Sequence, residues 1–130
     1  MEEGVSLKGR IIGFGGEEYE LRSPFGKDSP LRLLFSLSTG LSFLVINPYF
    51  VMDDYVLDLD DAVLRSLCLE RPQDVAVLCI VRPEADTLYV NLRCPLIINT
   101  KGGIFAQVIL QNEGYPMSFP FAKRLQRKDP

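Results

Sequence analysis

Short apolar runs, each ended by turn-forming residues, recur along most of the chain, and this rhythm constrains the fold more than any other feature. The segment VSLKGRI alternates apolar and polar side chains from Val5 to Ile11, as a strand with one buried face does. EYELRS repeats the alternation after the glycine-rich turn from Gly13 to Gly16. Many short strands with frequent turns are typical of antiparallel sheets that form barrels or sandwiches.

Further runs predict the remaining strands. Val75 to Val81 is apolar at every position, so we expect this strand to be buried on both faces. The stretch NTKGG predicts a hairpin turn. Other strands are expected in LRLLFSLS and SFLVI, joined at Thr39-Gly40, and over Leu88–Leu92, Leu96–Ile98 and Ile104–Leu110, with a turn at RPEAD.

One helix is expected, over the segment DDAVLRSLCLE. Asp60 or Asp61 can cap its start, its apolar residues form a narrow stripe, and Pro72 ends it. The predicted fold class is therefore all-β, a mostly antiparallel small β-barrel-like domain with one short helix. We expect a single domain over residues 1–121 and a basic, flexible C-terminal tail over residues 122–130.

The composition is that of a globular protein. Among 130 residues, 47% are hydrophobic and 24% are charged, which is ordinary for one folded domain. No uninterrupted apolar run is long enough for a transmembrane helix, and the acidic N-terminus lacks the order of a signal peptide. We therefore predict a cytoplasmic protein without a membrane partner.

Residues for catalysis are scarce. The chain contains no histidine, which excludes the usual Ser-His-Asp and Cys-His arrangements. Cys68, Cys79 and Cys94 form no CxxC pair and are expected to be buried, reduced thiols. Neither Gly26-Lys27 nor the GFGG turn has the spacing of a phosphate-binding loop. The sequence predicts no enzyme, no cofactor and no metal.

A strongly acidic stretch, from Met52 to Ala62, carries no basic residue. We expect Tyr55, Leu57 and Leu59 on the buried face of a strand here, with the carboxylates of Asp58 and Asp60 facing outward. A solvated surface is the favoured interpretation, a charge-selective partner surface the next, and a metal site the third, because the spacing does not fit a calcium loop. The aspartates concerned are Asp53, Asp54, Asp58, Asp60 and Asp61.

Several motifs, taken in order, resemble the flagellar assembly factor FliW family. They are Ser29-Pro30 before a leucine-rich strand, Asn47-Pro48-Tyr49, Asp54-Tyr55, Asn91-Leu92 with Pro95, Ile98-Asn99, and Gln107 to Leu110. The similarity extends from about Gly13 to Tyr115. Members usually carry further residues before the turn at Gly13, and a missing N-terminal strand would leave an open barrel edge.

The resemblance implies a β-barrel-like protein that binds flagellin and antagonises the translational repressor CsrA, which couples flagellin synthesis to export. It implies no direct contact with nucleic acid, and a monomer is favoured. As partner-binding candidates we take the five aspartates together with Asn47, Pro48, Tyr49, Phe50, Asn91, Pro95 and Asn99. For the asparagines and prolines, shaping of the backbone is the favoured alternative.

A rival interpretation is a small OB-like barrel that binds a nucleotide or RNA. Such a module needs stacking aromatic residues on a basic strand face. Tyr19, Tyr89 and Phe105 are scattered among neutral or acidic neighbours instead. A broad basic surface with interleaved aromatics, typical of nucleic-acid binders, is not indicated.

Overall fold

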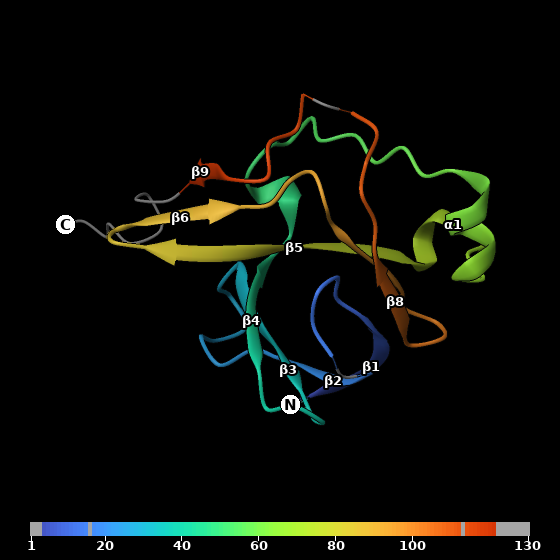
Figure 1. Cartoon of the computed structure of the whole chain (residues 1–130), viewed down its shortest axis with the longest axis horizontal. Coiled ribbons are helices and arrows are strands. Elements are labelled where there is room, and N and C mark those ends of the chain that lie inside the picture. Colours follow the sequence, from blue (N-terminus) through green and yellow to red (C-terminus); the bar gives the residue numbers. More distant parts are fainter. Residues whose placement is uncertain (1–3, 16, 113, 122–130) are drawn as a thin grey trace.

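The computed structural model describes residues 4–15, 17–112 and 114–121 (Figure 1). Its secondary structure is mostly β, with one short α-helix and two 3-10 turns. The strands are β1 (Val5–Arg10), β2 (Glu18–Arg22), β3 (Leu31–Ser36), β4 (Ser42–Ile46), β5 (Val75–Glu84), β6 (Thr87–Val90), β7 (Leu96–Asn99), β8 (Ile104–Gln107) and β9 (Phe119–Phe121). The helical elements are η1 (Pro48–Phe50), α1 (Asp61–Ser66) and η2 (Pro72–Asp74).

Seven strands close into a barrel. They follow the order β4-β3-β2-β1-β8-β7-β5, and a further pairing of β4 with β5 completes the ring. All neighbours are antiparallel except β1 and β8, which run parallel. The predicted mostly antiparallel barrel with one short helix is thus confirmed. The expected open edge is absent among the described strands, because β1 pairs with β2 on one side and β8 on the other.

Alternating residues of each barrel strand fill the interior, as the period of a strand requires. Tyr19, Leu34, Val45 and Leu96 are almost fully buried there. Gly9 belongs to this interior layer, and its position leaves no room for a side chain. A Cβ atom on Gly9 would lie 2.2 Å from the carbonyl oxygen of Phe105 and 2.6 Å from its ring. The close approach of β1 to β8 therefore requires glycine.

Two further apolar layers cover the outside of the barrel. Residues of β5 point alternately into the barrel and toward these outer layers. Every position of Val75–Val81 is therefore apolar, and none is exposed. In one layer, Cys79 and Val81 pack under the segment that follows η1 and under residues near Tyr115. In the other, Leu67 at the end of α1 packs on β5 and β7. Strand β6 pairs with the C-terminal half of β5, and β9 pairs with β6. Figure 1 shows these two strands on the side of the molecule away from α1.

Three local predictions were wrong. The segment from Tyr55 to Asp60 is extended and keeps the expected alternation of burial, but it pairs with no strand among the described residues. Helix α1 ends at Ser66, before Pro72, because Cys68 adopts a positive φ of 55° that interrupts the helical backbone. Strand β5 continues through the predicted turn, and Pro83 pairs opposite Leu88. Strand β9 was not predicted.

The two ends of the barrel differ. At one end, the ring of Phe14 packs edge-to-face on Phe43, with ring centres 5.1 Å apart. Gln107 also closes this end, because its side chain accepts the Ile12 N–H (2.9 Å) and donates to the Cys94 carbonyl (3.1 Å). At the other end, a cavity of about 1030 Å³ opens between the β7–β8 hairpin, the loop after β2 and the turn η1. We call this the open end.

Candidate functional site

The residues Asn47, Pro48, Tyr49 and Phe50, here called the aromatic turn, lie between β4 and the acidic stretch. Asn47 caps η1, since its Oδ1 accepts the Tyr49 N–H at 2.9 Å. Pro48 is buried and fixes the backbone, whereas Tyr49 and Phe50 are 41% and 61% exposed. Asn47 therefore shapes the turn as the asparagine-proline pair predicts, and the turn displays two aromatic rings to solvent.

A cluster of three tyrosines supports the residues that follow the aromatic turn. The Tyr55 ring stacks on Tyr115, with centres 4.8 Å apart, and meets Tyr49 edge-on at 5.6 Å. Its hydroxyl donates to the buried Leu92 carbonyl at 2.7 Å. The Tyr115 hydroxyl accepts the Val56 N–H, also at 2.7 Å. These bonds hold the segment on the barrel without a strand ladder.

Residues 53–61, here called the acidic segment, carry five aspartates on this support. All five aspartates are exposed, while Tyr55, Leu57 and Leu59 turn inward. None of the five forms an ion pair with another described residue. Asp60 has a structural task in addition, because its Oδ1 accepts the Val63 N–H (3.0 Å) and caps α1. Asp60 was one of the two residues predicted as the cap, with Asp61 as the other. The charge is thus available to a basic partner.

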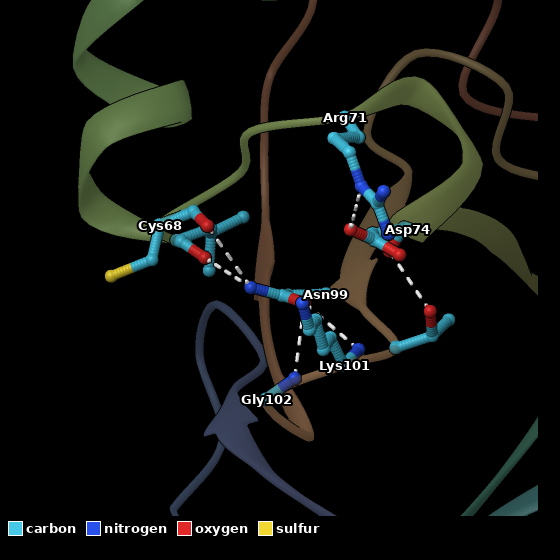
Figure 2. A network of polar contacts seen from close by, with 8 residues as sticks. Cys68, Arg71, Asp74, Asn99, Lys101 and Gly102 are labelled. Atoms are coloured by element: carbon cyan, nitrogen blue, oxygen red, sulfur yellow. Dashed lines mark hydrogen bonds and ion pairs between the residues drawn. The ribbon is translucent and has the colours of Figure 1, made fainter.

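Asn99 ties the end of α1 to the β7–β8 hairpin, as Figure 2 shows. Its Nδ2 donates to the carbonyls of Leu67 (2.8 Å) and Cys68 (3.3 Å). Its Oδ1 accepts the backbone N–H groups of Lys101 (2.9 Å) and Gly102 (3.0 Å). Asn99 is only 6% exposed, and all of these bonds lie within the chain. The structure therefore gives it a role in placing the hairpin.

Asn91 and Pro95 shape the connection between β6 and β7. The Asn91 Oδ1 accepts the Cys94 N–H, three residues further on, at 3.0 Å, and this bond fixes the loop between the two strands. Pro95 is fully buried just before β7, and its carbonyl accepts the Val108 N–H at 3.0 Å. Figure 2 adds the ion pair of Arg71 and Asp74 (3.4 Å) beside the hairpin. The contacts of Asn91, Pro95 and Asn99 organise the apolar segment from residue 91 to residue 110.

Cys79 and Cys94 are buried, as predicted. The prediction was wrong for Cys68, which is exposed in the turn that follows α1, where its φ is positive. Burial raises the pKa of the Cys79 thiol from 9.0 to about 12, against a smaller lowering by its hydrogen bond with Tyr55. Burial also raises the pKa of the Tyr55 hydroxyl, with the neighbouring Cys79 adding to the shift. A thiol held protonated in this way is a poor nucleophile, which suits a structural role.

Three basic residues of the open end were missed by the sequence analysis. Lys27, Arg32 and Lys101 line the cavity together with Tyr49 and Phe50 of the aromatic turn. One signal was present: Arg32 lies two residues before Leu34 in β3, so strand alternation puts it on the inner face. Nothing in the sequence indicated that Lys27 and Lys101 line the same cavity.

The aromatic residues considered for base stacking are placed elsewhere. Tyr19 and Phe105 are buried inside the barrel, where their rings meet edge-to-face at 5.3 Å. Tyr89 is half-buried, and the Arg82 guanidinium lies over its ring at 4.8 Å. These three rings thus do not form an exposed platform of the kind that single-stranded nucleic acid requires.

The described residues contain neither a cluster of metal-binding side chains nor a helix that could span a membrane. Across residues 4–15, 17–112 and 114–121, no three His, Cys, Asp or Glu side chains gather closely enough to hold a metal ion. Among the same residues, no helix combines the length and the apolar character that crossing a bilayer requires.

Comparisons with known proteins identify relatives over nearly the whole chain. A protein-family model described as "FliW protein" matches residues 1–121. The flagellar assembly factor FliW of Clostridium novyi is 30% identical over 125 residues, which cover 94% of this chain and 87% of the relative. The Bacillus subtilis protein of the same name is 30% identical over 122 residues, covering 92% and 85%.

A crystal structure of the flagellar assembly factor FliW has the same fold. It superimposes with a TM-score of 0.79 at 30% sequence identity, over 91% of this chain and 84% of the other. Sequence and fold thus agree over most of the chain. The chain belongs to the FliW family of flagellar assembly factors.

Proposed function

We propose that this protein is a non-enzymatic, cytoplasmic regulator that binds flagellin and antagonises the translational repressor CsrA. Flagellin would compete with CsrA for the protein. Export of flagellin would then free the protein to bind CsrA and relieve its block on flagellin messenger RNA, which ties flagellin synthesis to export. Family membership supports the role in flagellar assembly, and the two partners come from the family resemblance. Within the chain, the acidic segment is the observation that carries the proposal.

The acidic segment is suited to a basic protein surface. Its carboxylates are exposed and free of ion pairs with described residues, and the tyrosine cluster fixes the backbone beneath them. A fixed array of like charges attracts an oppositely charged partner over a distance and raises the association rate. An RNA-binding repressor needs a positive RNA surface, and an acidic protein bound beside it would repel phosphate.

The aromatic turn is the proposed contact for flagellin. Tyr49 and Phe50 expose much of their rings on a rigid 3-10 turn. Large, well-supported aromatic side chains are typical anchors for an amphipathic helix of a partner. Pro48, Pro95 and Asn99 are buried, so in this proposal they support the surface and do not touch a partner.

The test measures association of the purified chain with CsrA and with flagellin at low and high salt. Asp58→Lys should slow association with CsrA by about tenfold at low salt and weaken its salt dependence, because a charge is reversed at an exposed site. Asp58 is preferred to Asp60, whose carboxylate caps α1. Glu18→Lys, an equal charge change at an exposed residue of β2, serves as the matched control.

Tyr49→Ala should weaken flagellin binding about tenfold or more while CsrA association stays unchanged. Its fold is checked by urea unfolding. Wild-type protein that binds neither partner would overturn the proposed function. Equal effects of Asp58→Lys and Glu18→Lys would refute the acidic segment as the contact, even if both partners bind.

A further inference from the structure

The open end of the barrel carries an arginine on its inner face. In β3, Arg32, Leu34 and Ser36 alternate toward the interior, and Leu34 and Ser36 are fully buried there. Arg32 is half-buried at the mouth and lines the cavity. It forms no ion pair with any described residue. A half-buried guanidinium without an anion is costly, and an anionic ligand would offset this cost.

Arg22 lies on the outer face of the neighbouring strand β2 and provides a comparison with Arg32 on the inner face of β3. Its guanidinium pairs with Glu20 at 2.8 Å and lies over the Phe35 ring at 4.2 Å. Both arginines are half-buried, yet only the outward one has an acidic and an aromatic partner within the described chain. The contrast indicates that the described part of the chain supplies no acidic or aromatic partner for the inward guanidinium of Arg32.

Further hydrogen-bond donors line the same cavity as Arg32. Lys27 and Lys101 line the same cavity and form no ion pair with described residues. Asn47 lines it too, and since its Oδ1 is used by the Tyr49 N–H, its amide nitrogen remains as a donor. Asp28 is the one carboxylate among the described lining residues. The mouth is thus cationic in a chain whose formal net charge is −3.

The inner wall of the cavity is apolar. Leu7, Leu21, Leu78 and Ile98 line it and also belong to the barrel core. The volume of about 1030 Å³ is at the upper end of the range for small-molecule sites, about 300–1,000 Å³. A cavity lined by apolar core residues and by three basic side chains is complementary to a molecule with a hydrocarbon chain and one anionic group.

We propose that the open end binds an amphipathic carboxylate, such as a medium-chain fatty acid. Its carboxylate lies between Arg32 and Lys101, and its chain packs on Leu21 and Ile98. Charge-assisted hydrogen bonds orient the head, and burial of the chain supplies the remaining affinity. This site goes beyond the proposed function, since it requires neither flagellin nor CsrA.

Calorimetric titration of the full chain with sodium octanoate tests the proposal. Saturable binding is expected, about tenfold weaker or more in Arg32→Gln and in Lys101→Gln, because each loses a charge-assisted hydrogen bond. Arg22→Gln is the matched control, and it should bind as the wild type does. Lys101 is exposed, so Lys101→Gln leaves the proposal testable even if Arg32→Gln fails to fold.

A series of ligands separates the contribution of the carboxylate group to the affinity from that of the hydrocarbon chain. Between butyrate and octanoate, affinity should rise by up to about fourfold for every added CH₂ group, and octylamine should not bind. No saturable binding of octanoate would overturn the proposal. Equal binding of octanoate and inorganic phosphate would also overturn it, as would wild-type affinity in both cavity variants.

Discussion

The barrel and the acidic segment are both ordered, but by different means. Each barrel strand shares backbone ladders with two neighbours, so its position is set by many equivalent bonds. Residues 55–60 share no ladder, and they are held by the hydroxyls of Tyr55 and Tyr115 together with inward leucines. The position of the segment therefore depends on a few side chains. Each of them contributes more to that position than a single ladder bond contributes to the position of a barrel strand.

This difference suits the proposed division of labour. A closed barrel has no free edge through which it could pair with another chain. The segment, in contrast, leaves the outer side of its extended backbone and its carboxylates exposed to a partner. Single substitutions in the barrel should accordingly destabilise the barrel as a unit, whereas substitutions in the acidic segment should loosen only the segment.

The largest effect is expected for Gly9→Ala, inside the barrel. The new methyl group would meet the backbone oxygen of Phe105 at 2.2 Å, and β1 would have to move away from β8. We expect a loss of about 3 kcal/mol or more in the free energy of unfolding, measured by urea titration. Gly15→Ala is the control, since a Cβ there meets nothing within 4 Å. Similar losses in both variants would contradict the tight approach.

The barrel could be predicted well from the sequence, because its physical rules are local. Alternation predicted the faces of β1 and β2, and the uninterrupted apolar run predicted that β5 is buried on both faces. The turn at Gly102-Gly103 predicted the β7–β8 hairpin. What alternation does not encode is the pairing of strands distant in sequence. The parallel contact of β1 with β8 therefore came from the structure, and only Gly9 marks it.

The next effect concerns pH, at the junction of the two regions. Cys79 lies in the barrel wall beneath Tyr55, and its pKa is raised to about 12. Above pH 9 the Cys79 thiol loses its proton in the unfolded protein but keeps it in the folded protein. The free energy of unfolding that is present below pH 9 is therefore partly lost as the pH rises. The loss should reach about 3 kcal/mol over the first two units. Cys79→Ala should lack this part of the pH dependence, and parallel curves would refute it.

Tyr55→Phe should cost about 2 kcal/mol, since it leaves the buried Leu92 carbonyl without its donor. Amide exchange should show where the change acts: the Val56 N–H should exchange faster, while the amides of β2 keep their relative protection. Tyr49→Phe, at a partly exposed ring, should change stability by about 0.5 kcal/mol or less. Uniform acceleration throughout the barrel would show that the segment is not a separate unit.

The acidic segment was only partly predictable. Its alternating burial could be read from the sequence, and the inference of a strand was reasonable on that pattern alone. Its actual support is Tyr115, sixty residues after Tyr55, and no local rule links them. The open end was missed for the same reason, since Lys27, Arg32 and Lys101 come from three separate turns and strands.

The smallest effect, and the one that separates structure from recognition, is expected at Asp60. Asp60→Ala removes the cap of α1 and should cost about 1 kcal/mol. Asp60→Asn keeps an oxygen acceptor at the same position and should cost far less, while it removes the charge as completely as alanine does. If both variants are equally destabilised, charge and not the cap stabilises the helix. If Asp60→Asn keeps full stability but associates more slowly with CsrA, the carboxylate acts on the partner directly, because the helix beneath it is then unchanged.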